Sequence, residues 1–101
     1  MCGITGFINF TKDISSYKNV LNQMTDELSK RGPDERGIYV EKHICLGHRR
    51  LIVIDPKGGK QPMQVSYEGN TYTIVYNGQI YNTDELRKEL VLAGFNFERT
   101  L

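Results

Sequence analysis

The chain is poor in cysteine and carries no excess of charge of either sign. Its two cysteines, Cys2 and Cys45, lie far apart and lack the spacing of a CxxC motif. In a reducing compartment we expect two free thiols, and a disulfide between them is the alternative. The 13 Lys and Arg residues nearly balance the 12 Asp and Glu residues, which leaves a formal net charge of +1. Without a block of like charges, we expect neither nucleic acid nor a membrane surface as the main partner.

Long apolar runs are missing as well, and histidine is scarce. No segment approaches the length of a transmembrane helix, and no basic segment followed by an apolar stretch marks a signal peptide at the start of the chain. The cytoplasm is therefore the expected compartment. The two histidines, His43 and His48, have no third ligand at metal-binding spacing, so the sequence predicts no metal site.

What the sequence does contain is the composition of one small domain, with 39% hydrophobic and 25% charged residues. Hydrophobic periodicity predicts two helices among several strands. The predicted elements are a strand at 4–10, a helix at 15–31, strands at 37–40 and 43–55, two strands within 64–78 around a Glu-Gly-Asn turn, a helix at 84–92 and a strand from 95 onward. Asn82 or Thr83 would cap the second helix, and Gly94 would close it. This order predicts an α+β fold. Because the last strand has barely begun at Leu101, residues 1–101 are interpreted as a fragment of a domain.

Cys2 is the first candidate for chemistry, and its position allows two interpretations. Cysteine is among the most buried residue types, so Cys2 could simply fill space beside a strand. If Met1 is removed, however, the thiol and a free α-amine belong to one residue. That amine could take the proton of the thiol, which would make Cys2 a nucleophile with its own base.

Asn77 and Gly78 are the second candidate, and two interpretations stay open here as well. Asn-Gly is typical of a type I′ hairpin turn, in which both residues need a positive φ. The residues that follow lead within a few positions into the second predicted helix, so such a hairpin would have little second strand. In the alternative, the Asn77 side-chain amide and the Gly78 N–H point at one spot and stabilise an oxyanion.

Arg49 and Arg50 stand between polar residues and the apolar run LIVI. Most arginines are solvated at the surface. One that is buried beside a substrate site is the natural bidentate partner of a carboxylate, which would suit an amino-acid substrate. Cys45 lies within an apolar strand and is interpreted as a core thiol.

Five stretches in a fixed order resemble one protein family. They are MCGITGF at the start, RGPDERG after the first predicted helix, GHRRLIVID and KQPM in the middle, and VYNGQIYN before the second helix. Each stretch is weakly specific by itself, but their order, anchored at residue 2, is very specific and covers essentially the whole chain. On these motifs, the sequence resembles the class II glutamine amidotransferase domain of the glutamine-dependent asparagine synthetases.

The resemblance implies an N-terminal-nucleophile (Ntn) hydrolase fold, which is an αββα sandwich of antiparallel sheets between helix layers. This chain would hold only its N-terminal part. The resemblance also implies that Cys2, once Met1 is removed, attacks the side-chain amide of L-glutamine and forms a γ-glutamyl thioester. Ammonia would then pass to a C-terminal synthetase domain of the same polypeptide, which makes asparagine from aspartate. That absent domain would use ATP and Mg, and the amidotransferase domain itself would need no cofactor.

The matching motif positions supply the site residues that the resemblance implies. Arg50 would bind the α-carboxylate of glutamine, and Asn77 with Gly78 would form the oxyanion hole. The other glutamine-contacting positions would be Leu51, Ile52, Val53 and Gln79. Many relatives have Glu at the last of these positions, so Gln79 keeps an acceptor and loses a charge. The family's pattern continues with an aspartate for the substrate amino group beyond residue 101, and we therefore expect the 101-residue chain to be a weak glutaminase or none.

Two other functions stay open at this point. One is a binding module that keeps the amidotransferase fold without turnover, although the retained Cys2 argues against it. The other is an amidotransferase domain that serves a different ammonia acceptor. The sequence also leaves the oligomeric state open, with a homodimer among the arrangements it allows.

Overall fold

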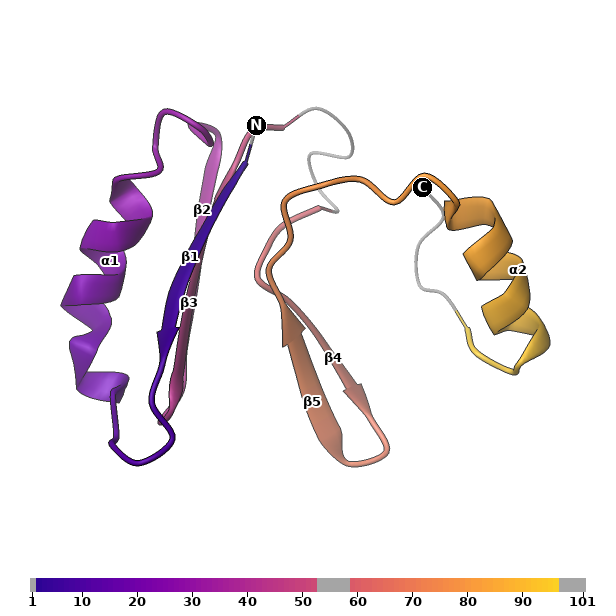
Figure 1. Cartoon of the computed structure of the whole chain (residues 1–101), viewed down its shortest axis with the longest axis horizontal. Coiled ribbons are helices and arrows are strands. Elements are labelled where there is room, and N and C mark those ends of the chain that lie inside the picture. Colours follow the sequence, from indigo (N-terminus) through magenta and orange to yellow (C-terminus); the bar gives the residue numbers. More distant parts are fainter. Residues whose placement is uncertain (1, 53–58, 97–101) are drawn as a thin grey trace.

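The computed structural model of the chain describes residues 2–52 and 59–96. Its regular elements, in chain order, are β1 (Gly3–Ile8), the short 3-10 helix η1 (Ser15–Tyr17), α1 (Lys18–Asp26), β2 (Glu35–Val40), β3 (Ile44–Arg50), β4 (Met63–Tyr67), β5 (Asn70–Ile74) and α2 (Thr83–Leu92). β1, β3 and β2 form one antiparallel sheet in that spatial order, and β4 pairs with β5 in a second one. Figure 1 shows α1 on one side of the three-stranded sheet, and the β4-β5 hairpin and then α2 beyond its other side. The predicted α+β class is therefore confirmed.

Side chains of the three-stranded sheet alternate between two faces, and the register groups them into a core face and an opposite face. Cys45 of β3 pairs with Phe7 of β1 and Val40 of β2, and all three belong to the hydrophobic core. His48 and Arg50 are an odd number of positions from Cys45, so they lie on the opposite face. The core face is the one that α1 covers, and Arg50 is turned away from it.

α1 approaches the core face most closely at Thr25. Leu21 and Thr25 of the helix are fully buried, and Thr25 Oγ1 donates a hydrogen bond of 2.7 Å to Leu21 O. Gly47 of β3 lies directly beneath, because a Cβ atom built there would be 2.1 Å from Thr25 Oγ1. Leu21 joins Ile14 and Cys45 in the core. The helix packs this tightly because residue 47 has no side chain.

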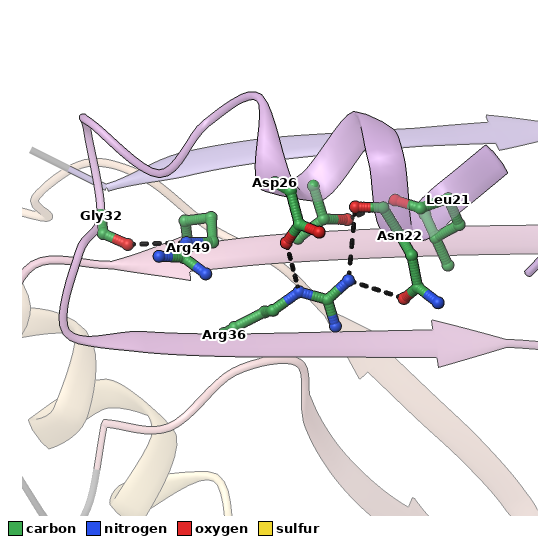
Figure 2. A network of polar contacts seen from close by, with 7 residues as sticks. Leu21, Asn22, Asp26, Gly32, Arg36 and Arg49 are labelled. Atoms are coloured by element: carbon green, nitrogen blue, oxygen red, sulfur yellow. Dashed lines mark hydrogen bonds and ion pairs between the residues drawn. The ribbon is translucent and has the colours of Figure 1, made fainter. Parts of the chain in front are cut away.

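Polar contacts at the rim of the core face tie β2 and β3 to the helical segment, as Figure 2 shows. Arg36 Nε donates to Asp26 Oδ1 at 2.7 Å, and Arg36 Nη2 donates to Asn22 Oδ1 at 2.6 Å. Arg49 Nε donates to Gly32 O at 2.8 Å. Arg36 and Arg49 are register partners. Their chain neighbours in β2 and β3 consequently lie together on the opposite face.

Two local turns in the second half follow the sequence signals. Glu68 and Gly69 join β4 to β5 with φ angles of 48° and 83°, the two positive values of a type I′ turn. After α2, Gly94 has a φ of 98°. Its N–H donates to Val91 O and the Phe95 N–H donates to Leu90 O, both at 3.0 Å, which is a Schellman motif. The predicted turn between the strands and the helix stop at Gly94 are both confirmed.

Two predicted elements are too long. The helix predicted at 15–31 begins as η1, and α1 ends at Asp26. Beyond that residue, backbone N–H groups bond mostly to carbonyls three residues back, as from Arg31 N to Leu28 O at 3.0 Å. The strand predicted at 43–55 is observed as Ile44–Arg50 and does not continue at 51–52, where the Ile52 N–H donates to a side chain, Asp34 Oδ2. Residues 53–55 of that prediction lie outside the described part.

Smaller differences concern the other boundaries. The strand predicted at 4–10 ends at Ile8, the one at 37–40 begins at Glu35, and α2 begins at Thr83. Asn82 occupies the N-cap position without a side-chain capping bond. The strand predicted from 95 is not present at 95–96, and its remaining residues lie outside the described part. Within the described ranges, no helix has the length and apolar character needed to cross a membrane.

Candidate functional site

The predicted site residues of the first half gather where β1 and β2 begin and β3 ends. Gly3 of β1 pairs with Arg49, and Glu35 of β2 pairs with Arg50. Cys2 immediately precedes the first of these pairs, so it lies at the same edge of the sheet as the end of β3. A residue at the chain start and residues about fifty positions later are thus placed side by side by the antiparallel register.

Cys2 is half-buried at this edge and is held by two contacts. Its Sγ atom lies 3.9 Å from Leu51 O in a weak S–H hydrogen bond. Arg31 Nε donates to the backbone carbonyl of Cys2 at 3.2 Å. The structure therefore brings together Cys2 and Leu51, two residues that the resemblance assigned to one site.

The two cysteines have separate places and are both free thiols. Cys45 is fully buried, and its Sγ lies 3.8 Å from Ile14 O. Burial raises the pKa of the Cys45 thiol, which disfavours the reactive thiolate. The interpretation of Cys45 as a core thiol is confirmed, and the alternative of a Cys2–Cys45 disulfide is wrong.

Arg50 is nearly buried and forms an ion pair with Glu35. Its Nη1 atom lies 2.9 Å from Glu35 Oε2, and the exposed fraction of its side chain is 6%. The backbone at Gly59 lies against the guanidinium, because a Cβ there would be 2.5 Å from Arg50 Nη2. The guanidinium is therefore already paired with one carboxylate, that of Glu35, and the predicted binding of a substrate carboxylate by Arg50 stays a prediction.

The segment after β3 is fixed by the RGPDERG stretch. Ile52 N donates to Asp34 Oδ2 at 2.7 Å, and Asp34 N donates to Arg50 O at 2.9 Å. Asp34 is thus hydrogen-bonded to the residue before Leu51 and to the residue after it. The carbonyl of Leu51 itself contacts Cys2 Sγ. Leu51 and Ile52 are half-buried. Val53, the third predicted glutamine-contacting residue of this run, lies outside the described residues.

Asn77 and Gly78 do not form the hairpin that one interpretation predicted. β5 ends at Ile74 and α2 begins at Thr83, and the described residues between them contain no strand. Asn77 is half-buried, whereas Gly78 and Gln79 are exposed. No hydrogen bond joins Gln79 to Cys2 among the residues that the structure describes. The hairpin interpretation is therefore wrong, and the oxyanion role of Asn77 and Gly78 stays a prediction.

This segment is anchored to the sheet through the residue before Asn77. His48 Nε2 lies 3.3 Å from Tyr76 O, and the side-chain amide of Gln61 also binds the Tyr76 backbone. His48 stands two positions before Arg50 on the same face of β3. The face that carries Arg50 is consequently also the one on which the Asn77 segment rests.

Burial determines the charge state of His48. Desolvation lowers the pKa of this fully buried imidazole below its usual 6.5, and the positive charge of Arg50 lowers it further. The Tyr76 carbonyl and Glu35 act in the opposite direction without cancelling the effect. His48 is therefore neutral at pH 7, and the tautomer that carries its proton on Nε2 can donate to the Tyr76 carbonyl.

Sequence reasoning missed three of the residues that build this site: Glu35, Gln61 and His48. Glu35 and Gln61 do occur in the stretches RGPDERG and KQPM, which carried the resemblance. Their partners are 15 residues away in the sequence, and no local pattern encodes that pairing. His48 was considered for metal binding, but within the described residues no group of three His, Cys, Asp or Glu side chains could hold a metal ion.

Comparison with known proteins gives a consistent result. A family model described as a glutamine amidotransferase domain matches residues 1–100. The chain is 54% identical over 100 residues to asparagine synthetase [glutamine-hydrolyzing] 3 of Bacillus subtilis, covering 99% of this chain and 16% of that protein. It is 40% identical to asparagine synthetase [glutamine-hydrolyzing] 1 of the same organism, covering 96% of this chain and 15% of that protein. It is 39% identical to asparagine synthetase [glutamine-hydrolyzing] 1 of Arabidopsis thaliana, covering 89% of this chain and 15% of that protein. The chain spans about one sixth of the length of these relatives.

Proposed function

The chain belongs to the glutamine amidotransferase domain family, and from this premise we propose that it supplies the glutaminase half of an asparagine synthetase. In this proposal Cys2 hydrolyses L-glutamine to glutamate. The ammonia passes to a C-terminal synthetase domain of the same polypeptide, which makes asparagine from aspartate. The names of the relatives, each a glutamine-hydrolyzing asparagine synthetase, support this choice of acceptor over a different one.

The observation that carries the proposal is the position of the Cys2 thiol at the end of β3. Its Sγ atom contacts Leu51 O, and Leu51 directly follows the nearly buried Arg50. A free amino acid has a carboxylate at one end, which the guanidinium of Arg50 is suited to bind. Leu51, Ile52, Val53 and Gln79 would then complete the contacts along the glutamine chain.

The proposed bond-making and bond-breaking steps use groups of this chain and water. Once Met1 is removed, the α-amine of Cys2 takes the thiol proton, and the thiolate attacks the side-chain amide carbon of glutamine. The negative oxygen of the tetrahedral intermediate is stabilised by the Asn77 side-chain amide and the Gly78 N–H. The protonated amine then gives its proton to the leaving nitrogen, ammonia departs, and the γ-glutamyl thioester remains. Water, deprotonated by the same amine, attacks the thioester and releases glutamate and the Cys2 thiol.

The order of layers in Figure 1 supports an Ntn-hydrolase sandwich as the fold of the full domain. The helix α1, the three-stranded sheet, the β4-β5 hairpin and α2 follow one another in the order helix, sheet, sheet, helix. We propose that the chain is the N-terminal part of such an αββα sandwich, working in the cytoplasm, where both cysteines would remain reduced. ATP and Mg²⁺ belong to the proposed synthetase domain, and glutamine hydrolysis by Cys2 needs neither.

A matched pair of cysteine variants tests this proposal in the full-length gene product that carries the chain. Cys2→Ala removes the nucleophile, so we expect glutamate release from glutamine to fall by more than about 1000-fold. Cys45→Ala removes the other thiol in the core, and the folded fraction of that variant should keep its activity. Glutamate release is measured by an enzyme-coupled assay. Activity that survives Cys2→Ala would overturn the proposal and favour a fold retained for binding.

Mass spectrometry tests the role of the free amine. After treatment with a glutamine-like electrophile, the active protein should lack Met1 and carry one adduct on Cys2. An active protein that retains Met1 would show that the α-amine is not the base, because the amine is then part of a peptide bond.

A further inference from the structure

The side-chain amide of Gln61 binds both backbone polar groups of one residue, Tyr76. Gln61 Oε1 accepts a hydrogen bond of 2.6 Å from Tyr76 N, and Gln61 Nε2 donates one of 3.1 Å to Tyr76 O. The Tyr76 carbonyl belongs to the same peptide group as the backbone nitrogen of Asn77. A single side chain thereby sets the orientation of the Tyr76–Asn77 peptide. That peptide leads directly into Asn77, and the Gly78 N–H belongs to the peptide group that follows.

His48 provides a second donor to the same carbonyl. Its Nε2 atom lies 3.3 Å from Tyr76 O, and a carbonyl oxygen has two lone pairs that can accept both bonds. His48 belongs to the central strand β3 and is fully buried. The Tyr76–Asn77 peptide is thus held both by the central strand and by Gln61.

Gln61 is itself seated on the sheet, beside His48. A Cβ atom at Gly37 of β2 would lie 1.9 Å from Gln61 O and 2.8 Å from Pro62 Cδ. The segment at 61–62 therefore lies directly on β2, in space that any other residue at position 37 would occupy. Gly37 is the register partner of His48, so both anchors of the Tyr76 carbonyl come from one place on the face that carries Arg50.

We propose that Gln61 is a positioning residue for the oxyanion pair Asn77 and Gly78. It does not touch the substrate. It acts by fixing the Tyr76–Asn77 peptide, which holds Asn77 directly and the following peptide with the Gly78 N–H through Asn77, so that both donors point at the tetrahedral oxygen. This inference rests on the proposed function, because it needs Cys2 to form that intermediate. The inference assigns a function to Gln61 in the KQPM stretch. The resemblance identified that stretch as a family motif without giving any of its residues a role.

The expected effect falls on the chemical step more than on substrate binding. An oxyanion forms only in the transition state and intermediate, and loss of one oxyanion donor typically lowers kcat by about 100- to 1000-fold. Displacing the two oxyanion donors should lower kcat less than deleting one of them, and we expect a decrease in kcat of about 10- to 100-fold. Arg50 binds the substrate carboxylate in the ground state, so KM for glutamine should change by less than about threefold.

The test compares three variants of the full-length gene product, with glutamine hydrolysis as the assay. Gln61→Ala should lower kcat by about 10- to 100-fold with KM nearly unchanged. Gln64→Ala is the matched control, because Gln64 is an exposed glutamine whose Nε2 donates to Thr73 Oγ1 within the hairpin, at 3.1 Å. Its kcat and KM should both stay within about twofold of wild type, as for surface changes in general.

Gln61→Glu adds a readout that a purely structural role would not produce. The carboxylate still accepts from Tyr76 N, but it places a second acceptor against the Tyr76 carbonyl. Protonation restores a donor there, so the ratio of the variant kcat to the wild-type kcat should rise as the pH falls toward the carboxyl pKa, about 4.3 when unperturbed. Alkylation of Cys2 by a glutamine-like electrophile shows in each variant that the glutamine site is folded.

The results for the Gln61 variants and for the wild-type protein test the inference and the proposed function separately. If Gln61→Ala is folded by the alkylation test and retains the wild-type kcat, or if it raises KM while kcat stays unchanged, the inference is wrong. A kcat ratio for Gln61→Glu that does not vary with pH also contradicts it. A wild-type protein that does not hydrolyse glutamine would instead overturn the proposed function, so the two failures are distinguishable.

Discussion

At the scale of single residues, the ion pair between Arg50 and Glu35 is the contact whose loss should cost the most stability among the polar pairs described. The Arg50 side chain has an exposed fraction of 6% and that of Glu35 one of 28%. A guanidinium stays charged at every accessible pH. Removing its partner leaves a buried charge with one charge-assisted bond fewer, so Glu35→Ala should lower the free energy of unfolding by about 1–3 kcal/mol.

A second ion pair supplies the control for that prediction. Arg36 and Asp26 are as close, at 2.7 Å, but their side chains have exposed fractions of 31% and 61%. Exposed pairs contribute little, so Asp26→Ala should change the free energy of unfolding by less than about 1 kcal/mol. Both values come from urea denaturation of the same protein. Equal effects of the two substitutions would contradict the argument that burial determines the contribution of the Arg50 pair.

The candidate site was predictable from the sequence only in part. Cys2, Arg50 and Leu51 could be named from motifs, and the structure brings Cys2 and Leu51 into contact. Glu35 and Gln61 could not be named, because their roles depend on which residue lies opposite in space. The register that pairs Glu35 with Arg50 follows from the alignment of the whole strands β2 and β3. It cannot be predicted from the two residue types alone.

At the scale of elements, the close contact between α1 and β3 depends on the absence of a side chain at Gly47, opposite the hydroxyl of Thr25. A Cβ at Gly47 would lie 2.1 Å from Thr25 Oγ1, in a fully buried position where the hydroxyl already donates to Leu21 O. Neither the helix nor the strand can shift without disturbing the core. Gly47→Ala should therefore lower the free energy of unfolding by about 1–3 kcal/mol through overpacking.

A double-mutant cycle isolates this steric contact. Thr25→Ala removes the hydroxyl that a side chain at residue 47 would meet, at the cost of the hydrogen bond to Leu21 O. The cost of Gly47→Ala measured in the Thr25→Ala background should then be smaller than in wild type by at least about 0.5 kcal/mol. The measurement is again urea denaturation. Additive effects would show that the close approach of α1 to β3 does not limit the packing.

Element types followed from the sequence better than element ends did. The helix predicted at 15–31 was correct in its amphipathic centre, where Leu21 and Thr25 are buried. Its predicted end was wrong because the turns from residue 27 to Gly32 use bonds to carbonyls mostly three residues back, which leaves the hydrophobic spacing almost unchanged. Leu51 and Ile52 were predicted as strand from their apolar side chains, and the sequence does not show the tertiary hydrogen bond from Ile52 N to the Asp34 carboxylate that replaces strand pairing there.

At the scale of the whole molecule, burial is distributed unevenly between the two halves. Among the described residues, the buried hydrophobic side chains are Ile14, Leu21 and Cys45, all on the side of the three-stranded sheet that α1 covers. α2 has no buried residue, and every residue of β4 is exposed. A tilted ring pair of Tyr67 and Phe95, whose centroids are 6.1 Å apart, joins the hairpin to the segment that follows α2.

This asymmetry predicts a gradient of local stability in the 101-residue chain. Segments with few buried apolar contacts open at lower free energy than the core, and amide hydrogen exchange reports that opening. Backbone amides of β3, which is the central strand and lies under α1, should exchange at least about 10-fold more slowly than those of β5, a difference of about 1.4 kcal/mol in opening free energy. Exchange is followed by NMR or mass spectrometry, with rates corrected for intrinsic sequence effects. Equal protection of β3 and β5 would contradict this prediction and show that the two sheets open as one cooperative unit. The contact between His48 of β3 and the Tyr76 carbonyl would then couple the opening of the hairpin to that of the three-stranded sheet.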